Sequence, residues 1–277
     1  MFQQKLFRAL YFTFGMLLGT ASTSLSQSNP ASQTDNEMSK TPVVVMFCDV
    51  TNSLLKDENQ NVAEHAAQFL KNFPDKAEVI VYPIHIQTQR MMPIIKWQIP
   101  VRTTSKDRIL YGNELTRYVK HVVKEIDTLY KEVNKLQPQD RSCIINTIET
   151  ACRYFRQFDV IKYRFELIYI SDMFEECGQT PIKQTINMRK DILMAKKQAD
   201  MLPKSELLKN VHITVVLPTA RSSITQSRPD INDVKQTWEI IFGHYGFPKQ
   251  RFEDVSWFRM DSVFPERFQS AQSQARR

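Results

Sequence analysis

One apolar run that ends in polar side chains at alternate positions constrains this sequence more than any other feature. Residues 43–48 are Val, Val, Val, Met, Phe and Cys, and Asp49, Thr51 and Ser53 follow them. A near-continuous apolar segment rich in β-branched residues predicts a strand covered on both faces, as in a parallel sheet. Ligands of open α/β sheets bind beyond the carboxyl ends of such strands. The three side-chain oxygens are therefore candidates to bind a hard cation. The alternative is that Thr51, Asn52 or Ser53 caps the following helix.

A second apolar run has the same ending. Residues 164–171 are largely apolar, and Asp172 follows them. If both runs are strands of one sheet, Asp49 and Asp172 lie side by side at its edge. Between the two runs, Ser142 precedes a helical pattern whose apolar residues share one face. These residues are Ile144, Ile148, Ala151 and Phe155.

This order of motifs resembles the von Willebrand factor A-type (VWA) domain with its metal-ion-dependent adhesion site. The resemblance covers residues 42–261 and concerns motif spacing and the order of elements. It implies that five side chains surround one divalent cation (Mg²⁺, or Mn²⁺ or Ca²⁺), some of them through water, and that a partner's carboxylate completes the shell. These side chains are Asp49, Thr51, Ser53, Ser142 and Asp172. The family usually has serine at the position of Thr51, and threonine with a nearby glycine at that of Ser142. Both hydroxyls are kept here.

The rest of the chain predicts alternating strands and helices. Helical spacing predicts helices at 52–72, 113–136, from 143, at 182–202 and at 233–245. Further β-rich runs predict strands at 78–87, 91–99, 211–217 and 255–260, the first two as an antiparallel hairpin that VWA domains also place at one sheet edge. Pro83 lacks a ladder donor and predicts a bulge or irregular pairing there. The expected fold is α/β, a doubly wound, mostly parallel six-stranded sheet with one antiparallel edge hairpin, Rossmann-like.

The two ends of the chain are expected to lie outside this domain. Residues 1–25 predict an export signal, because Lys5 and Arg8 precede a short apolar centre and a small-residue exit. The protein is therefore expected to be periplasmic or extracellular, and it contacts a membrane only if this segment is retained as an anchor. Residues 26–41 predict a flexible linker and residues 262–277 a polar tail.

Composition argues against two common classes of function. The chain has only six glycines, and neither G-x-G-x-x-G nor G-x-x-x-x-G-K-[ST] occurs, which disfavours the usual nucleotide-binding motifs. The formal charge of +7 does not by itself indicate nucleic acid. Basic residues alternate with acids on the predicted helices, as in Lys120, Lys124, Glu125 and Asp127. This pattern favours a solvated mixed-charge surface, and no nucleic-acid partner is predicted.

The four cysteines suit an oxidising compartment but not a zinc site. Their even number is compatible with disulfides, and no two are two to four residues apart. Cys48 and Cys152 are expected to be small core residues. A bridge between Cys143 and Cys177 would join the two loops of the candidate site, which we state as a hypothesis.

Four further polar features have less specific interpretations. Glu175 and Glu176 follow Asp172 and are interpreted as solvated loop charges, with tuning of the metal site or repulsion of acidic partners as the alternative. His85 is interpreted as a packed or edge residue rather than a ligand. Residues 219–230 form a polar segment after the predicted strand 211–217, and they are a candidate contact loop for a partner.

The leading functional hypothesis is an exported, divalent-metal-dependent protein-binding module, used in adhesion or assembly, that grips an acidic group of its partner. It is not expected to be an enzyme, because no nucleophile has a recognisable base. One alternative is a VWA-fold scaffold without metal binding. Another is a metal-dependent phosphoesterase that uses the two strand-end aspartates. Thr51 disfavours that reading, because a phosphatase of the haloacid-dehalogenase type would have an acid there.

Overall fold

The computed structural model describes a defined part of the chain. The described residues are 40–51, 56–85, 92–133, 142–173, 175, 209–218, 231–244, 246 and 249–254. Several predictions fall outside them, namely those for 1–25, most of 26–41, Ser53, Glu176, Cys177, 182–202, 219–230, 255–260 and 262–277. Among the described residues, no helix has both the length and the apolar character that crossing a membrane requires.

The described elements alternate as expected for an α/β fold. In chain order they are β1 (Thr41–Asp49), α2 (Lys56–Asn72), β2 (Glu78–Ile84), β3 (Ile95–Gln98), α3 (Ser105–Val133), α4 (Ile144–Phe155), β4 (Tyr163–Ile170), β5 (Val211–Leu217), α6 (Ile231–His244) and β6 (Lys249–Asp254). The α/β class is confirmed. Strand β6 was not predicted from the sequence, and the strand predicted at 255–260 lies outside the described residues.

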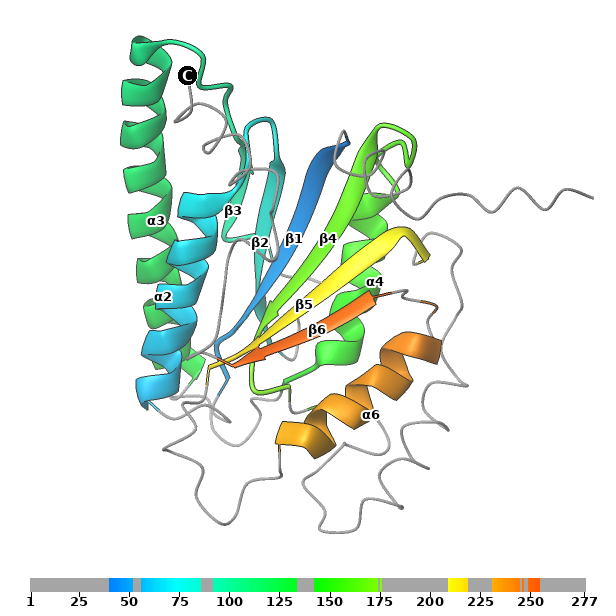
Figure 1. Ribbon diagram of the computed structural model, residues 1–277. Helices are drawn as coiled ribbons and strands as arrows, with labels where there is room; N and C mark the ends of the chain where they lie inside the picture. The colour runs from blue at the N-terminus through cyan, green and yellow to red at the C-terminus, as the bar shows by residue number, and fades with distance from the viewer. Residues whose placement is uncertain are drawn as a thin grey trace, which may run out of the picture.

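The sheet has the strand order β3-β2-β1-β4-β5-β6. Strands β1, β2, β4, β5 and β6 run parallel, and β3 pairs antiparallel with β2 at one edge. The chain leaves β1 towards β2 and leaves β4 towards β5, so the connections diverge on either side of the β1–β4 pair (Figure 1). Such a divergence is where open α/β sheets place their ligand sites.

Two hydrophobic cores cover the two faces of the sheet. Alternate residues of β1 point to opposite faces, and both sets are fully buried, which explains its continuous apolar run. Val45 and Phe47 belong to the core beneath α4 and α6, named here the α4/α6 core. Met46 and Cys48 belong to the core beneath α2 and α3, named the α2/α3 core. Figure 1 shows α2 and α3 together over one face.

Of the two outcomes predicted at Pro83, a bulge or irregular pairing, the bulge is absent from the β1–β2 ladder. The β1–β2 register continues unbroken from Val43↔Glu78 through Cys48↔Pro83 to Asp49↔Ile84. The β2–β3 ladder, in contrast, ends at the pair Val81↔Ile95, before the proline. Strand β2 therefore accommodates Pro83 because the ladder on its other side has already stopped.

Helix α3 begins eight residues before its predicted start at residue 113. Thr104 and Asp107 form a reciprocal cap at this end. The Asp107 N–H donates to Thr104 Oγ1 (3.1 Å), and the Thr104 N–H donates to Asp107 Oδ2 (2.9 Å). The hydrogen bonds that the Asp107 carboxylate accepts, first of all that from the Thr104 N–H, also lower its pKa. Ile109 and Leu110 are 66% and 53% exposed, so the apolar spacing on which the prediction depended fails in this first part of the helix.

Candidate functional site

The carboxyl ends of β1 and β4 lie next to each other and carry buried polar side chains. Cys48 pairs with Ile170 in the parallel register, so Asp49 and Ser171 follow at the same edge. We name five buried residues there the strand-end site: Asp49, Thr51, Ser142, Ser171 and Asp172. The first four have no exposed surface, and Asp172 is 4% exposed. Burial of so many oxygen atoms requires that they bond to one another or to a ligand.

Both carboxylate oxygens of Asp49 accept hydrogen bonds. Oδ1 accepts from the backbone N–H of Thr51 (3.0 Å) and from the Thr51 hydroxyl (2.6 Å). Oδ2 accepts from the Ser171 hydroxyl at 2.6 Å. A carboxylate bonded to the N–H two residues later closes a tight turn, which explains why the chain bends sharply at the end of β1.

The hydroxyl of Ser142 extends this network to a third segment of the chain. Its Oγ lies 2.6 Å from Thr51 Oγ1 across 91 residues of sequence. Thr51 has one hydroxyl hydrogen, which it donates to Asp49, so Ser142 is the donor to Thr51. Three predicted site residues are thus joined directly, and Asp172 is buried one residue beyond Ser171. Ser53 lies outside the described residues.

The residue after Asp172 has a left-handed backbone. Met173 has φ 63°, a conformation that costs an L-residue other than glycine about 1–2 kcal/mol. Two hydrogen bonds hold it there. Its N–H donates to Ser171 Oγ (2.9 Å), and its carbonyl accepts from Trp238 Nε1 of α6 (2.8 Å). The turn that carries Asp172 is therefore fixed from both sides.

Glu175 caps a helix rather than facing solvent, so the interpretation as a solvated loop charge is wrong. It is 1% exposed, and its Oε2 accepts the N–H of Ile145 at 2.7 Å. The N-cap residue of α4, Cys143, makes no side-chain cap of its own. A carboxylate at a helix N-terminus satisfies a backbone donor and is favoured by the helix dipole. Glu175 thus joins the loop after β4 to the start of the helix that follows Ser142.

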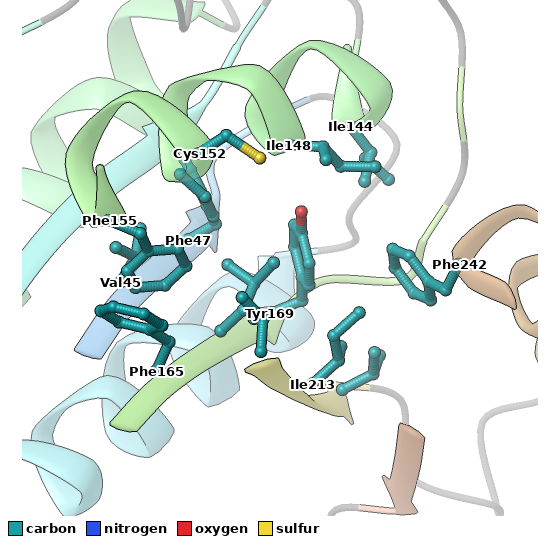
Figure 2. Packing of buried hydrophobic residues seen from close by; sticks show 14 of the residues in the cluster. Val45, Phe47, Ile144, Ile148, Cys152, Phe155, Phe165, Tyr169, Ile213 and Phe242 are labelled. Atoms are coloured by element: carbon teal, nitrogen blue, oxygen red, sulfur yellow. The ribbon is translucent and has the colours of Figure 1, made fainter. Parts of the chain in front are cut away.

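Aromatic side chains of the α4/α6 core connect β1, β4 and α6 to the start of α4, next to the strand-end site. Phe47 stacks on Tyr169 with ring centroids 5.4 Å apart, and Tyr169 lies 6.0 Å from Phe242 of α6. The Tyr169 hydroxyl is directed towards α4 (Figure 2), where it lies 2.7 Å from Thr147 Oγ1. Thr147 in turn donates to the carbonyl of Ile144 in the first turn of α4 (2.6 Å). This core therefore contacts the same helix end that follows Ser142.

The cysteines have two different states. Cys48 and Cys152 are free and buried, as predicted. Burial, and then the neighbouring charge of Asp49, raises the pKa of Cys48, and burial raises that of Cys152 to about 11. Cys143 is disulfide-bonded. Cys177 is the remaining cysteine of the sequence and lies outside the described residues.

The position of His85 follows from the pairing of β1 with β2. It directly follows Ile84, the β-ladder partner of Asp49, and so belongs to the same edge of the sheet. Its partial burial lowers its pKa.

The donor set of the strand-end site fits a hard cation. Carboxylate and hydroxyl oxygens are typical ligands of Mg²⁺, Mn²⁺ and Ca²⁺, whereas zinc and copper sites use imidazole or thiolate. The described residues contain no group of three or more His, Cys, Asp or Glu side chains arranged to hold a metal ion. A cation here would instead depend on two carboxylates together with hydroxyls.

Comparison with known proteins finds similarity only among solved structures. No protein-family model and no curated protein matches the sequence. Proximal thread matrix protein 1 from the mussel byssus is 9% identical, with a TM-score of 0.39 over 83% of this chain and 46% of that one. A von Willebrand factor type A protein from Catenulispora acidiphila is 10% identical, with a TM-score of 0.40 over 83% of this chain and 41% of that one. The human COPII-coat protein Sec24c is 9% identical, with a TM-score of 0.40 over 80% of this chain and 30% of that one. The chain thus spans less than half of each of these proteins.

Proposed function

We propose that this protein is an exported, divalent-cation-dependent protein-binding module of VWA type. In this proposal the strand-end site holds Mg²⁺, or Mn²⁺ or Ca²⁺, and the cation grips a carboxylate of a protein partner. The observation that supports it is the hydrogen-bonded series Ser142, Thr51, Asp49 and Ser171, which joins three chain segments at the ends of two adjacent parallel strands. This is the place where open α/β sheets bind ligands.

Each protein group would have a distinct part in such a site. Asp49 and Asp172 supply the negative charge that holds a dication, and Thr51 and Ser142 supply neutral oxygens. Ser53 joins this set through the resemblance of its motif to VWA domains. The bound ion supplies a positive charge that attracts an acidic group. The module needs no catalytic residues for this task, and we propose no enzymatic activity.

One observation favours a second candidate function, a VWA-fold scaffold that binds no metal. Both oxygens of Asp49 already accept hydrogen bonds from Thr51 and Ser171. A carboxylate satisfied in this way needs no cation for a stable fold. In that case the hydroxyls would serve to fix the loops, and partner contacts would be made elsewhere.

Thermal unfolding of the full chain distinguishes the two candidates. The melt is recorded in EDTA and then in excess Mg²⁺ or Mn²⁺. A cation bound only by the folded state at a hundredfold excess over its Kd adds about 2.7 kcal/mol of stability, or about 5–10 °C in Tm for a domain of this size. This rise should be absent in Asp49→Ala.

Asp75→Ala is the matched control for this experiment. Asp75 also accepts a backbone N–H, that of Arg102 (2.9 Å), but it precedes β2 at the opposite end of the strands. Its removal should lower Tm and leave the metal-dependent rise intact. No rise in the wild-type protein at millimolar metal would contradict the cation-dependent module and leave the metal-free scaffold.

A further inference from the structure

The loop after β4 is held by contacts from three directions. Ser171 donates to Asp49 of β1 (2.6 Å), and Glu175 accepts from the first turn of α4 (2.7 Å). Between them, the carbonyl of Met173 accepts from Trp238 of α6 at 2.8 Å, across 65 residues of sequence. The first two contacts come from segments that themselves belong to the strand-end site or adjoin it. The third comes from a helix with no residue in the site.

Trp238 is fixed by packing as well as by its hydrogen bond. It is 1% exposed and is one of the largest fully buried side chains among the described residues. Its ring lies 5.1 Å from that of Phe242, which in turn contacts Tyr169 of β4. A buried indole donor with a defined partner holds that partner in a narrow range of positions.

The partner of Trp238 is the strained residue of the loop. Met173 has a positive φ, a conformation that persists only when the surrounding structure enforces it. Its N–H donates to the same Ser171 hydroxyl that donates to Asp49. One continuous series of hydrogen bonds therefore leads from Trp238 through Met173 and Ser171 to Asp49.

We propose that Trp238 is a positioning residue of the strand-end site, acting through the Met173 carbonyl to hold the turn that carries Asp172. This inference rests on the proposed cation-binding function. It assigns to α6 a role in setting the affinity of the site. Loss of a residue that orients metal-binding side chains typically weakens metal affinity about 10–100-fold. Because coupling free energy is reciprocal, loading of the site also stabilises the α6 contact.

The test compares two Trp→Phe variants in the full chain. Trp238→Phe removes the N–H and keeps an aromatic ring against Phe242. Trp97→Phe is the matched control, because Trp97 is 4% exposed and its buried Nε1 has no hydrogen-bond partner among the described residues. Affinity for Mn²⁺ is measured by electron paramagnetic resonance. We expect Trp238→Phe to weaken it about tenfold and Trp97→Phe to leave it unchanged. Equal affinity in Trp238→Phe and the wild type would overturn the inference.

A second measurement separates failure of this inference from failure of the proposed function. Hydrogen–deuterium exchange of peptides covering 171–175 is followed in EDTA, where no cation is needed. Faster exchange in Trp238→Phe than in Trp97→Phe shows that Trp238 holds the loop, even if the wild type binds no Mn²⁺ and the cation-binding proposal falls. If exchange in Trp238→Phe is unchanged, Trp238 does not hold the loop, whatever the measured Mn²⁺ affinity.

Discussion

Within the described residues, the two cores are similar in size and differ in how they are connected to the candidate site. Each contains fully buried phenylalanines, with Phe155 and Phe242 in the α4/α6 core and Phe69 and Phe73 in the α2/α3 core. In the α4/α6 core the polar atom of the largest aromatic residue is bonded to the loop after β4. In the α2/α3 core the buried Nε1 of Trp97 makes no hydrogen bond within the described residues.

This difference indicates that the two cores contribute differently to the free energy of unfolding and to the positions of the site residues. Hydrophobic packing tolerates substitutions of similar volume, whereas a hydrogen bond fixes the distance and direction between two atoms. The α2/α3 core therefore contributes mainly to the free energy of unfolding. The α4/α6 core contributes to it as well and also positions the strand-end site, through Trp238 and through the contact of Tyr169 with Thr147.

The largest expected effect comes from truncating one phenylalanine in each core. Phe242→Ala and Phe69→Ala each remove a fully buried ring, and each should lower the free energy of unfolding by about 3–5 kcal/mol. Denaturant unfolding measures this loss. Only Phe242→Ala should also speed hydrogen exchange at 171–175, because Phe242 packs against Trp238.

Both variants must be compared under conditions in which each remains folded. The far-ultraviolet circular dichroism spectrum of each variant provides that control. Equal acceleration of exchange at 171–175 in Phe69→Ala would show that the two cores are not distinct in their connection to the site.

A smaller effect on the free energy of unfolding is expected from a change in pH, through His65 of α2. Burial lowers the pKa of His65, which is 5% exposed. As pH falls through the ordinary value of 6.5, the unfolded chain binds this proton before the folded one does. Stability should therefore fall between pH 7.5 and about 5.5, a range in which ordinary carboxylates remain ionised. Chemical denaturation at several pH values measures it.

His65→Gln is the variant that tests this assignment. It should flatten the pH dependence of stability over that range. The pKa of His85 is lowered in the same sense by burial, so a shallower slope is expected to remain. An unchanged slope in His65→Gln would contradict the assignment to α2.

The smallest effect is on thiol reactivity, since each core contains one free cysteine. Cys48 belongs to the α2/α3 core and Cys152 to the α4/α6 core. The thiolate is the reactive form, and burial raises both pKa values, that of Cys152 to about 11. Neither should react with Ellman's reagent in the folded protein, and both should react in guanidinium.

Single variants report on each core separately. Of the two free thiols among the described residues, Cys48→Ser leaves that of Cys152, which is 6% exposed and should react sooner on partial unfolding than the fully buried Cys48 that remains in Cys152→Ser. Four thiols in guanidinium without a reductant would contradict the disulfide at Cys143.

The fold was predictable where one local pattern decides an element. The apolar runs of β1, β4 and β5 are buried on both faces, so their composition alone identifies them. The start of α3 was missed although Thr104 and Asp107 have the spacing of a capping box. The exposed Ile109 and Leu110 obscured the helical period there.

The candidate site was predictable only where its residues lie next to strands or helices that the sequence identifies. Asp49, Thr51 and Ser142 come together because their motifs follow or precede recognisable elements. Ser171 is the last residue of the second apolar run, directly before Asp172, and no contact was predicted for it. Glu175 and Trp238 could not be identified from local sequence, because their partners lie 30 and 65 residues away. Their contacts depend on how α4 and α6 pack, which no local pattern specifies.

The adjacency of β1 and β4 also has a consequence for the order of events during synthesis. Asp49 and Ser171 are 122 residues apart, so their contact forms only after β4 has been made and has paired with β1. No fragment that ends before β4 contains the complete set of oxygens. A newly made chain therefore acquires the strand-end site late, and occupancy of that site would report that β4 has been made and has paired with β1.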